Sequence, residues 1–400
     1  MKLLFVHDQF GGRGGAESNI YDTAAELKRR GHVVGILHGP GTGQQELEWR
    51  ETFEHRFSLT NEDDPIATAA ALKSFQPDVI YVHKLPDLEA LQTLVASGVS
   101  LVRLVHDHDI YCMRSYKYHP LSRANCQRAA SPYCIFPCGA SIARNRGPGL
   151  PFKWISYTEK KREIRLNQQF QRMMVYSQYM KDELIRNGFE AQRIEIHAPL
   201  HAQQDDTPRS SFSERNLILF VGQLIRGKGV DVLLEALAQV QAPFECLILG
   251  EGSHRSYCEN LCQSLGLGDR VHFRGFIKAE EIVKHYLECS VALVSSVWPE
   301  PFGMAGPEAM RHGLPVVAFD VGGISEWLMD GVNGYLLPRM DRAGFAARVQ
   351  ELLRDKTLAR RLGERGRHMV RRKHDPSKQI AALERMFENV ISETGRRLNP

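Results

Sequence analysis

The chain has 400 residues, a length typical of two domains that each bury their own core. Hydrophobic residues make up 43% and charged residues 24%, while 33 glycines and 19 prolines are too few for a disordered or collagen-like chain. The net charge of +4 does not by itself indicate a nucleic-acid partner. Composition therefore indicates an ordinary globular protein.

The N-terminus carries a short apolar run, Leu3–Val6, followed by His7 and Asp8. Four apolar residues are typical of a strand and are too few for the core of a signal peptide. No run approaches the ~18 apolar residues of a membrane span. We therefore expect a cytoplasmic protein, open to peripheral contact with the inner face of the membrane. Its eight cysteines are expected to be thiols or metal ligands rather than structural disulfides.

Short apolar runs alternate with amphipathic stretches along the first half of the chain. The predicted elements, in chain order, are a strand at Leu3–Val6, a helix at Ala16–Arg30, and strands at Val33–Leu37, Val79–Val82, Leu101–Val105 and Met173–Tyr176. This alternation predicts a parallel sheet with helices on both faces.

A polar, proline-containing stretch, His201–Ser213, interrupts this pattern, which then starts again. The second half is predicted to hold strands at Leu217–Val221, Cys246–Leu249, Val271–Phe273, Val291–Val294 and Val316–Phe319, and helices at Val230–Val240 and Ile380–Ile391. We therefore predict an α/β fold of two Rossmann-like, doubly wound parallel-sheet domains, 1–205 and 212–375, followed by a C-terminal helix, 376–400. Ligands of such sheets bind beyond the carboxyl ends of the strands, which favours a site in a cleft between the domains.

A glycine-rich loop, Gly11–Glu17, joins the first strand to the first helix. Glycines let backbone N–H groups approach a phosphate at a helix N-terminus, and the alternative is a turn that only connects the two elements. The G-x-G-x-x-G fingerprint fails because Glu17 stands where its last glycine would be. The second strand also runs into Leu37-His38-Gly39 without an acidic residue. Both observations disfavour a dehydrogenase.

The most informative segment, Ser295–Met310, directly follows a predicted strand. Gly303 leads into a predicted helix, so Glu300 lies in the loop before the helix and Glu308 lies one turn inside it. Such a pair suits a ligand with hydroxyls at both ends and phosphates between them. The carboxylates would accept hydrogen bonds from sugar hydroxyls, and the amides at Gly303 and Met304 would face the phosphates.

Glycine-containing turns also follow other strands of this half. One of them, Gly222–Gly229, carries Arg226 and Lys228, whose charges would neutralise a diphosphate. Further glycine turns occur at Gly250–Gly252, Gly275–Ile277 and Val321–Gly323. Glycine at so many strand ends of one domain favours a ligand site over a purely structural pattern.

In this order and at these intervals, the motifs resemble those of the GT-B glycosyltransferases of retaining family 4, the glycosyl transferases group 1 type. The matching residues span most of the chain: Gly14–Glu17, the Gly-x-Leu-x-x-x-Lys-Gly pattern of Gly222–Gly229, the E-x7-E pair Glu300 and Glu308, Gly313–Val317 and Val321–Gly323. The resemblance implies two Rossmann-like domains that face each other across a cleft. It also implies a last helix that crosses back to the first domain.

The resemblance further implies roles for individual residues. The catalytic residues would be Glu300, which contacts hydroxyls of the transferred sugar, and His106, which lies beside that sugar. The donor-binding residues would be Gly14, Gly15, Arg226, Lys228, Gly250, Phe276, Ile277, Phe302, Gly303, Met304 and Glu308. Lys228 and the amides of Phe302–Met304 would hold the diphosphate, and Glu308 would hold the ribose. The backbone at Phe276-Ile277 would hold the base.

Two positions depart from the family's pattern: Gln223 stands where arginine is usual, and Gly227 stands where glutamate is usual. We expect Arg226 to supply the missing positive charge. Asp107-His108-Asp109 also spells D-x-D, the metal-binding signature of the other major glycosyltransferase fold, but three-residue patterns are common and the context differs. No divalent metal is required for catalysis in this interpretation, because the basic residues and helix amides stabilise the departing diphosphate.

The resemblance therefore implies a retaining, metal-independent transferase that moves a sugar from a UDP- or GDP-sugar to a hydroxyl acceptor. The acceptor would be a sugar, a lipid-linked molecule or another small molecule, in polysaccharide, glycolipid or other glycoconjugate biosynthesis. Two alternatives stay open: a GT-B-fold nucleotide-sugar isomerase or phosphorylase, and a non-catalytic binder of membranes or nucleic acids. A phosphorylase would need a lysine-held pyridoxal phosphate, and a binder explains neither Glu300 nor Glu308. No nucleic-acid partner is expected.

Four cysteines lie close together in the sequence: Cys112, Cys126, Cys134 and Cys138. Their spacing is C-x13-C-x7-C-x3-C, and only the last pair resembles a metal-ligand spacing. Some relatives of the family carry a similar cysteine-containing insertion. A structural zinc that holds this loop is one interpretation, and unpaired thiols are the other.

The stretch Ala143–Arg172 has eight Lys or Arg against two Glu, with apolar and aromatic residues interleaved. In the family the first domain binds the acceptor, and a basic, aromatic surface suits an anionic membrane or a lipid-linked sugar. The alternative is a solvated helix whose apolar residues pack inward. A second basic run, Arg354–Lys373, is expected to be a solvated helix face.

Overall fold

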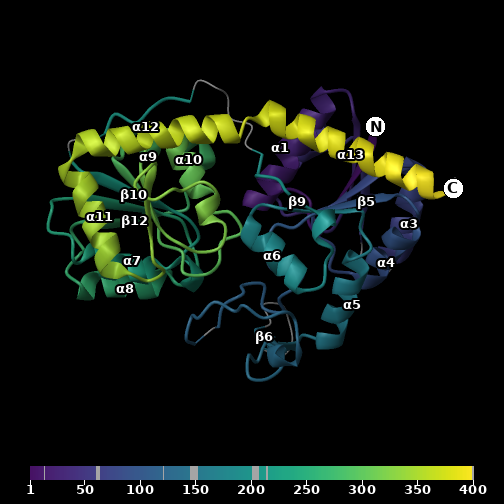
Figure 1. The fold of residues 1–400 in the computed structure, drawn as a ribbon, viewed down its shortest axis with the longest axis horizontal. Helices are drawn as coiled ribbons and strands as arrows, with labels where there is room; N and C mark the ends of the chain where they lie inside the picture. Colours follow the sequence, from purple (N-terminus) through teal and green to yellow (C-terminus); the bar gives the residue numbers. More distant parts are fainter. Residues whose placement is uncertain are drawn as a thin grey trace. The chain divides into compact units, whose positions relative to one another are not determined.

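The computed structural model describes residues 1–12, 14–59, 64–119, 121–144, 152–200, 207–212 and 215–398 (Figure 1). Parts of the linker His201–Ser213 and of the basic stretch Ala143–Arg172 lie outside the described residues. The chain forms two compact units. The first comprises residues 1–117, 126–202 and 376–400, and the second comprises residues 118–125 and 203–375.

The first unit is built on a seven-stranded sheet in the order β3-β2-β1-β4-β5-β8-β9, and every strand pair in it is parallel. The strands are β1 Lys2–His7, β2 Val33–His38, β3 His55–Ser58, β4 Val79–Val82, β5 Ser100–Leu104, β8 Arg172–Val175 and β9 Ile194–Ile196. Its helices are α1 Gly15–Arg29, α2 Glu46–Thr52, α3 Asp64–Phe75, α4 Leu88–Ala96, α5 Tyr157–Asn167, α6 Gln178–Arg186 and α13 Pro376–Leu398. Because helices cover both faces of the sheet, β4 is buried along its whole length and reads as an unbroken apolar run.

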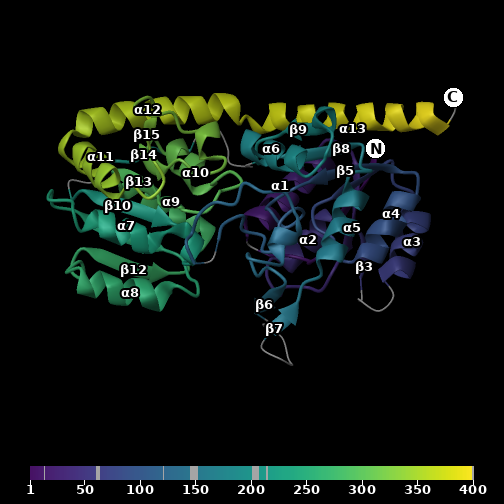
Figure 2. The same ribbon diagram turned by 60° about the horizontal axis from the view of Figure 1, so that its bottom comes forward.

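A long excursion leaves the sheet between β5 and α5. It holds a short 3₁₀ helix, η1 Pro132–Cys134, and a two-stranded antiparallel sheet of β6 Ile142–Arg144 and β7 Phe152–Trp154. Figure 2 shows β6 and β7 away from the seven-stranded sheet. One part of the excursion, Tyr118–Asn125, belongs to the second unit.

The second unit is built on a six-stranded parallel sheet in the order β12-β11-β10-β13-β14-β15. The strands are β10 Leu217–Val221, β11 Glu245–Leu249, β12 Val271–Gly275, β13 Val291–Val294, β14 Val316–Phe319 and β15 Gly334–Leu337. The helices are α7 Val230–Leu237, α8 Arg255–Ser264, α9 Ala279–Glu288, α10 Ala305–Arg311, α11 Arg342–Arg354 and α12 Lys356–Lys373. The turn η3 Arg226–Lys228 joins β10 to α7.

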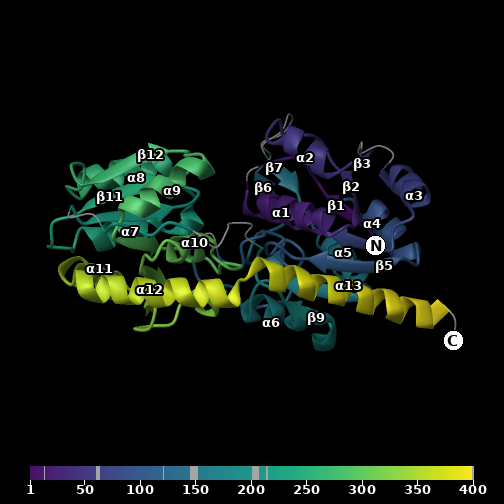
Figure 3. The ribbon, with the colours of Figure 1, turned by 90° about the horizontal axis from the view of Figure 1, so that it is seen from above.

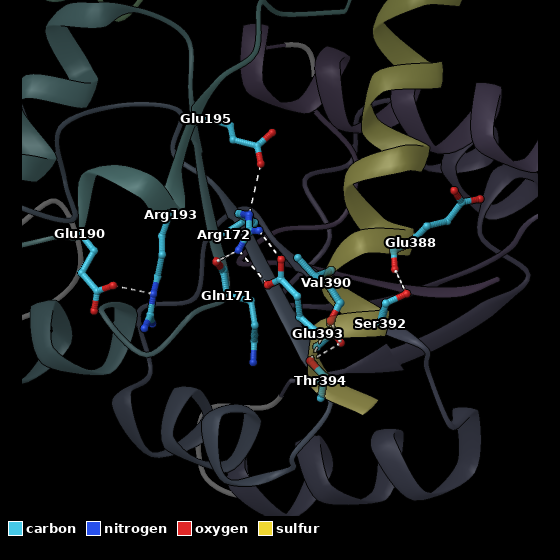
Figure 4. A network of polar contacts seen from close by, with 11 residues as sticks. Gln171, Arg172, Glu190, Arg193, Glu195, Glu388, Val390, Ser392, Glu393 and Thr394 are labelled. Atoms are coloured by element: carbon cyan, nitrogen blue, oxygen red, sulfur yellow. Dashed lines mark hydrogen bonds and ion pairs between the residues drawn. The ribbon is translucent and has the colours of Figure 1, made fainter. Parts of the chain in front are cut away.

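The last helix, α13, packs beside β5 of the first unit (Figure 3). Its buried residues recur at helical spacing and form one apolar stripe: Ile380, Leu383, Met386, Phe387 and Val390. Polar contacts at its end hold the helix in register (Figure 4). The guanidinium of Arg172 in β8 donates to both carboxylate oxygens of Glu393, at 2.6 and 3.1 Å. The hydroxyl of Ser100 donates to that of Thr394 at 2.9 Å.

The structure confirms the predicted α/β class and the two parallel sheets. The predicted strands at Val79–Val82, Leu217–Val221, Val291–Val294 and Val316–Phe319 have the observed bounds. The sequence did not predict β3, β9, β15 or the pair β6 and β7. Across the described part of the chain, no helix is both long enough and apolar enough to cross a bilayer.

Candidate active site

Four neighbouring strands of the first unit end in ring-bearing polar residues. His7 closes β1, His83 directly follows β4, His106 follows β5 and Tyr176 directly follows β8. Because these strands are adjacent and parallel, their carboxyl ends meet at one edge of the sheet. Of the four, only His106 was predicted from the sequence as a site residue.

His106 is held on both sides by hydrogen bonds. Its Nδ1 lies 2.7 Å from the hydroxyl of Tyr176, and its Nε2 lies 2.9 Å from Nδ1 of His83. Burial, reinforced by the nearby His7, lowers the pKa of His106 to about 3. Burial also lowers the pKa of His83, and it raises that of Tyr176. The three hydrogen-bonded side chains Tyr176, His106 and His83 are therefore neutral at physiological pH, and their hydrogen bonds fix the position of the His106 ring.

The glycine loop before α1 folds around Glu17. Oε1 of Glu17 lies 3.6 Å from Nε2 of His7. Burial favours a higher pKa for Glu17, but His7 outweighs it and keeps the pKa below its ordinary value. A Cβ at Gly14 would come 2.1 Å from Oε2 of Glu17, so a larger residue there would require the end of that side chain to move. At Gly15 a Cβ would meet nothing within 4 Å, and this residue is exposed.

Two carboxyl groups, Asp107 and Asp109, follow His106 in the sequence, and their pKa values shift in opposite directions. Burial and the neighbouring Asp109 raise the pKa of Asp107, while Arg103 and Lys84 help to keep that of Asp109 low against its own burial. The amide of Asp109 donates to Asp107 Oδ1 at 2.6 Å. Asp107 therefore retains its proton more readily than an ordinary aspartic acid does, while Asp109 stays ionised. The sequence showed these residues only as a common D-x-D pattern.

In the second unit, Glu300 receives three hydrogen bonds on one oxygen. Its Oε1 accepts from Lys228 Nζ at 2.6 Å, from Trp298 Nε1 at 2.9 Å and from the hydroxyl of Ser296. Glu300 is only 3% exposed, and burial favours a higher pKa. The ammonium of Lys228 and the other two donors outweigh burial, so the pKa of Glu300 lies below its ordinary value and the carboxylate stays charged.

The backbone around Glu300 is held by close glycine packing. Gly322 has a φ of +58°, and a Cβ there would come 2.2 Å from the carbonyl oxygen of Glu300. The amide of Gly323 donates to that same carbonyl at 2.7 Å. Beyond Glu300, the indole of Trp327 donates to the carbonyl of Phe302 at 2.6 Å. The loop that carries Glu300, Phe302, Gly303 and Met304 into α10 is thereby fixed from the β14 side.

Glu308, in the first turn of α10, has a different environment from Glu300. Its Oε2 accepts from the hydroxyl of Tyr286 at 3.2 Å. Burial raises the pKa of Glu308 to about 7, because the Tyr286 hydrogen bond and Arg311 only partly oppose it. The two glutamates predicted as a pair thus differ in charge near neutral pH.

The remaining predicted donor-binding residues lie at neighbouring strand ends of the same sheet. Gly250 follows β11 with a φ of +143°, and a Cβ there would come 1.9 Å from the carbonyl oxygen of Gly222, so these two turns pack against each other. Phe276 follows β12 and is 60% exposed, and Ile277 is half-buried. Arg226 is exposed, and its guanidinium donates to the carbonyl of Leu121 at 3.4 Å.

Sequence reasoning missed the segment Tyr118–Asn125, which forms a hairpin against the second unit. Tyr118 and Asn125 pair in an antiparallel bridge. Arg123 forms an ion pair with Asp231 in the first turn of α7, at 2.5 Å, and both side chains are about nine-tenths buried. Nothing in the local composition distinguishes this hairpin from the rest of the loop, because its partner lies 108 residues away.

The four clustered cysteines are all free thiols and half-buried. Burial raises the pKa of Cys134, and the neighbouring Cys112, Cys138 and Cys126 raise it further. Within the described ranges, no three His, Cys, Asp or Glu side chains converge in a geometry that could hold a metal ion. The other four cysteines, all in the second unit, are buried.

Comparison with known proteins identifies the family of both halves. A family model described as "Glycosyl transferases group 1" matches residues 203–369, and one described as "Glycosyltransferase Family 4" matches residues 13–198. The chain is 35% identical over 144 residues to an uncharacterized glycosyltransferase of Methanocaldococcus jannaschii, covering 36% of this chain and 37% of the relative. It is 30% identical over 161 residues to the lipopolysaccharide core biosynthesis glycosyltransferase LpsE of Rhizobium meliloti, covering 40% and 45%. The matched part thus spans less than half the length of each relative.

Among solved structures, the fold is similar to that of Anabaena HepE in complex with UDP and glucose. The TM-score is 0.73 at 21% sequence identity, with 97% of this chain and 100% of the Anabaena chain covered. This likeness extends over nearly the whole chain and supports the GT-B fold.

Proposed function

The chain belongs to the glycosyl transferases of group 1, family 4, and from that membership we propose that it transfers a sugar from a UDP- or GDP-sugar to a hydroxyl acceptor with retention of configuration. The family models cover both units, which supports transfer as the activity. The Rhizobium relative is a glycosyltransferase of lipopolysaccharide core biosynthesis, and the Anabaena neighbour binds UDP and glucose. Both support a nucleotide-sugar donor and a role in glycoconjugate biosynthesis.

The observation that carries the proposal is the contact between Lys228 and Glu300. The ammonium and the carboxylate lie 2.6 Å apart at the carboxyl ends of β10 and β13, inside the segment that matches the group 1 model. In a bound nucleotide sugar, the diphosphate would form an ion pair with Lys228, and the sugar hydroxyls would donate hydrogen bonds to Glu300. Glu308, eight positions further on, would accept from the ribose hydroxyls in its ionised form.

The proposed reaction follows from where charge develops. The bond between the anomeric carbon and the diphosphate oxygen breaks, which leaves positive character on the sugar and negative charge on the nucleoside diphosphate. Lys228 and Arg226 stabilise that negative charge, so the proposal needs no divalent cation. The acceptor oxygen then bonds to the anomeric carbon on the face that the diphosphate left, and its proton passes to a diphosphate oxygen.

His106 is proposed to lie beside the transferred sugar. Its two ring nitrogens are already engaged by Tyr176 and His83, so its ring cannot rotate without breaking a buried hydrogen bond. A neutral imidazole in a fixed position can contact the sugar and interact with it through its dipole, but it does not serve as a source of protons. Gly14 and Gly15 are proposed to present backbone amides near the donor.

The test is a panel of UDP- and GDP-sugars, with release of nucleoside diphosphate as the readout. We expect hydrolysis or transfer with one donor class, and loss of at least tenfold in the variant Glu300→Gln. Glu259→Gln, which alters a surface carboxylate of α8 in the same unit, is the matched control and should retain full activity. Absence of both turnover and nucleotide binding would overturn the proposal, and phosphorolysis or isomerisation of the nucleotide sugar would support the alternative enzymes.

The role of Arg226 has its own test. Its guanidinium is exposed at the β10 turn, where the family's usual arginine is replaced by Gln223. We expect Arg226→Ala to weaken UDP binding about tenfold, measured by titration calorimetry, since a charge-assisted contact to phosphate is lost. Unchanged UDP affinity would show that Arg226 does not compensate for Gln223.

A structural zinc at Cys112, Cys126, Cys134 and Cys138 is retained as a proposal. The other three thiols raise the pKa of Cys134, which supports their proximity, although their described geometry is not that of a metal site. Metal analysis of the purified protein decides the matter. About one zinc per chain would support the proposal, and a zinc content near zero would remove it.

A further inference from the structure

The excursion of the first unit exposes an unusual concentration of large apolar side chains, which we call the apolar ribbon. It consists of the sheet β6–β7 and the turn before it, and its members are Ile135, Phe136, Ile142, Phe152 and Trp154. Phe136 is 83% exposed, Trp154 71%, Phe152 65% and Ile142 55%. Side chains of this size are normally at least half-buried in a globular protein, so their exposure on one short segment calls for a partner.

The register of the two strands gathers the apolar side chains on one face. Ile142 is paired directly with Trp154, so the two side chains project from the same side of the sheet. Phe152 lies two residues before Trp154 and shares that side, while Lys153 between them projects from the other. This side of the sheet therefore carries Ile142, Phe152 and Trp154, and the register pairs Phe152 with Arg144. Figure 2 shows β6 and β7 projecting from the rest of the first unit.

The segment that contains the apolar ribbon carries basic residues and no acidic ones. Between Asp109 and Glu159 the sequence contains no acidic residue, although the chain has 47 of them. The same segment contains these basic residues: Arg114, Lys117, Arg123, Arg128, Arg144, Arg146 and Lys153. Lys117 and Arg123 are held by internal ion pairs, whereas Lys153 on β7 is exposed. The charge next to the ribbon is thus positive, without a neighbouring carboxylate from its own segment to neutralise it.

We propose that the apolar ribbon docks on an anionic lipid bilayer. Phenylalanine and tryptophan at the end of a projecting sheet suit the boundary between headgroups and acyl chains. Lys153 between them attracts the negative surface, and its long side chain can reach headgroups from the opposite strand face. The contact is shallow and reversible, because three or four inserted side chains and a few charges give only modest affinity.

Tryptophan emission makes this proposal directly measurable. The chain has four tryptophans, and Trp49, Trp298 and Trp327 are at most 9% exposed. Trp154 is therefore the tryptophan whose emission responds to transfer from water into lipid. With vesicles of phosphatidylglycerol and phosphatidylcholine we expect a blue shift and co-sedimentation. With pure phosphatidylcholine, or with anionic vesicles in 0.5 M salt, we expect at least tenfold weaker binding.

Two variants and one control distinguish binding through the apolar ribbon from nonspecific hydrophobic binding. Phe152→Ser combined with Trp154→Ser should lower partitioning to anionic vesicles at least tenfold, and Lys153→Glu should lower it severalfold. Ile66→Ser removes an equally exposed apolar side chain from α3 and should leave binding unchanged. Because the readout is binding, the result does not depend on the proposed transferase activity.

Three outcomes would overturn the proposal. The wild-type chain could fail to bind anionic vesicles, or the double variant could bind them as well as the wild type. Concentration-dependent dimerisation that shifts Trp154 emission without lipid, and is abolished in the double variant, would assign the ribbon to a second copy of the chain instead.

Discussion

Lys228 and Glu300, which are predicted to hold the diphosphate and the sugar of one donor, lie 2.6 Å apart and form a hydrogen bond with each other. The contact joins the turn after β10 to the loop after β13. The ammonium also lies 5.7 Å from the centre of the Trp298 ring, whose indole N–H donates to the same carboxylate. Removing either charge therefore alters both the stability of this sheet edge and the proposed donor site.

Lys228→Met should destabilise the second unit by about 2–4 kcal/mol, because Glu300 is left buried without its cation. Urea unfolding measures the loss. UDP affinity should fall at least tenfold in the same variant, by titration calorimetry. Lys278→Met, on an exposed lysine before α9, is the control and should change neither quantity.

The double variant Lys228→Met with Glu300→Gln separates the two effects. With no charge left to bury, most of the lost stability should return, while UDP binding and turnover stay impaired. A double variant as unstable as Lys228→Met alone would contradict the assignment of the loss to the unpaired carboxylate.

Glu308 should make stability and nucleotide binding depend on pH in opposite directions. Its folded pKa, about 7, lies above the ordinary value of 4.5, so between these values the folded state binds more protons than the unfolded state. The free energy of unfolding should therefore fall as pH rises from about 4.5 to 7, by an amount on the order of 1–3 kcal/mol. UDP binding should strengthen as pH rises through 7, because the proposed acceptor of the ribose hydroxyls is the ionised carboxylate.

Glu308→Gln removes this titration while keeping the side-chain shape. Both pH dependences should flatten in the variant, as measured by urea unfolding and by UDP titration between pH 5 and 8. Wild-type profiles that are already flat across this range would show that Glu308 does not titrate there.

Parallel-sheet architecture was predictable because the strands are buried on both faces. The runs at β1, β4, β10 and β13 are almost wholly apolar, and only a doubly covered strand favours such a run. The two edge strands of the first sheet escaped prediction for the same reason. β3 and β9 are largely exposed, so their sequences, His55–Ser58 and Ile194–Ile196, carry no apolar run.

The site was predictable to the extent that its signal was local in sequence. The glycine turns and the spacing of Glu300 and Glu308 each lie within a short window of the sequence, so a local pattern can predict them. Tyr176 and His83 depend on strand order, which brings residues 70 and 23 positions from His106 to its ring. A signal was nonetheless present, because each of them is the polar residue that directly follows a buried apolar strand.

Gly227, where the family usually has glutamate, should not tolerate a side chain. A Cβ at this buried position would come 3.1 Å from Cγ of Trp298, and the amides of Val297 and Trp298 donate to its carbonyl. We expect Gly227→Ala to cost about 1–3 kcal/mol in unfolding free energy by pushing Trp298 from its contact with Glu300. Gly395→Ala, where a Cβ meets nothing, should be neutral or stabilising, and a neutral Gly227→Ala would contradict the packing argument.

Arg123 should keep the hairpin Tyr118–Asn125 ordered. Arg123→Ala removes its buried ion pair with Asp231, and we expect hydrogen exchange in this hairpin to become at least tenfold faster. Amides of β10 should exchange as before, which serves as the internal control. Unchanged exchange in the hairpin would show that its other contacts, such as that from Arg339 to the carbonyl of Arg123, suffice.

Tyr176→Phe tests whether the fixed ring of His106 matters for turnover. The variant removes the hydroxyl 2.7 Å from Nδ1 and leaves a buried nitrogen without that partner, so the ring loses one of its two anchors. We expect kcat to fall about tenfold with the KM for the donor unchanged, since a loss of about 1.4 kcal/mol corresponds to one hydrogen bond. Tyr111→Phe is the matched control, because Tyr111 makes the same 2.7 Å contact with His108, outside the proposed site. Equal losses of kcat in the two variants would show a general effect of buried hydroxyls, whereas a loss confined to Tyr176→Phe would assign Tyr176 the task of positioning His106.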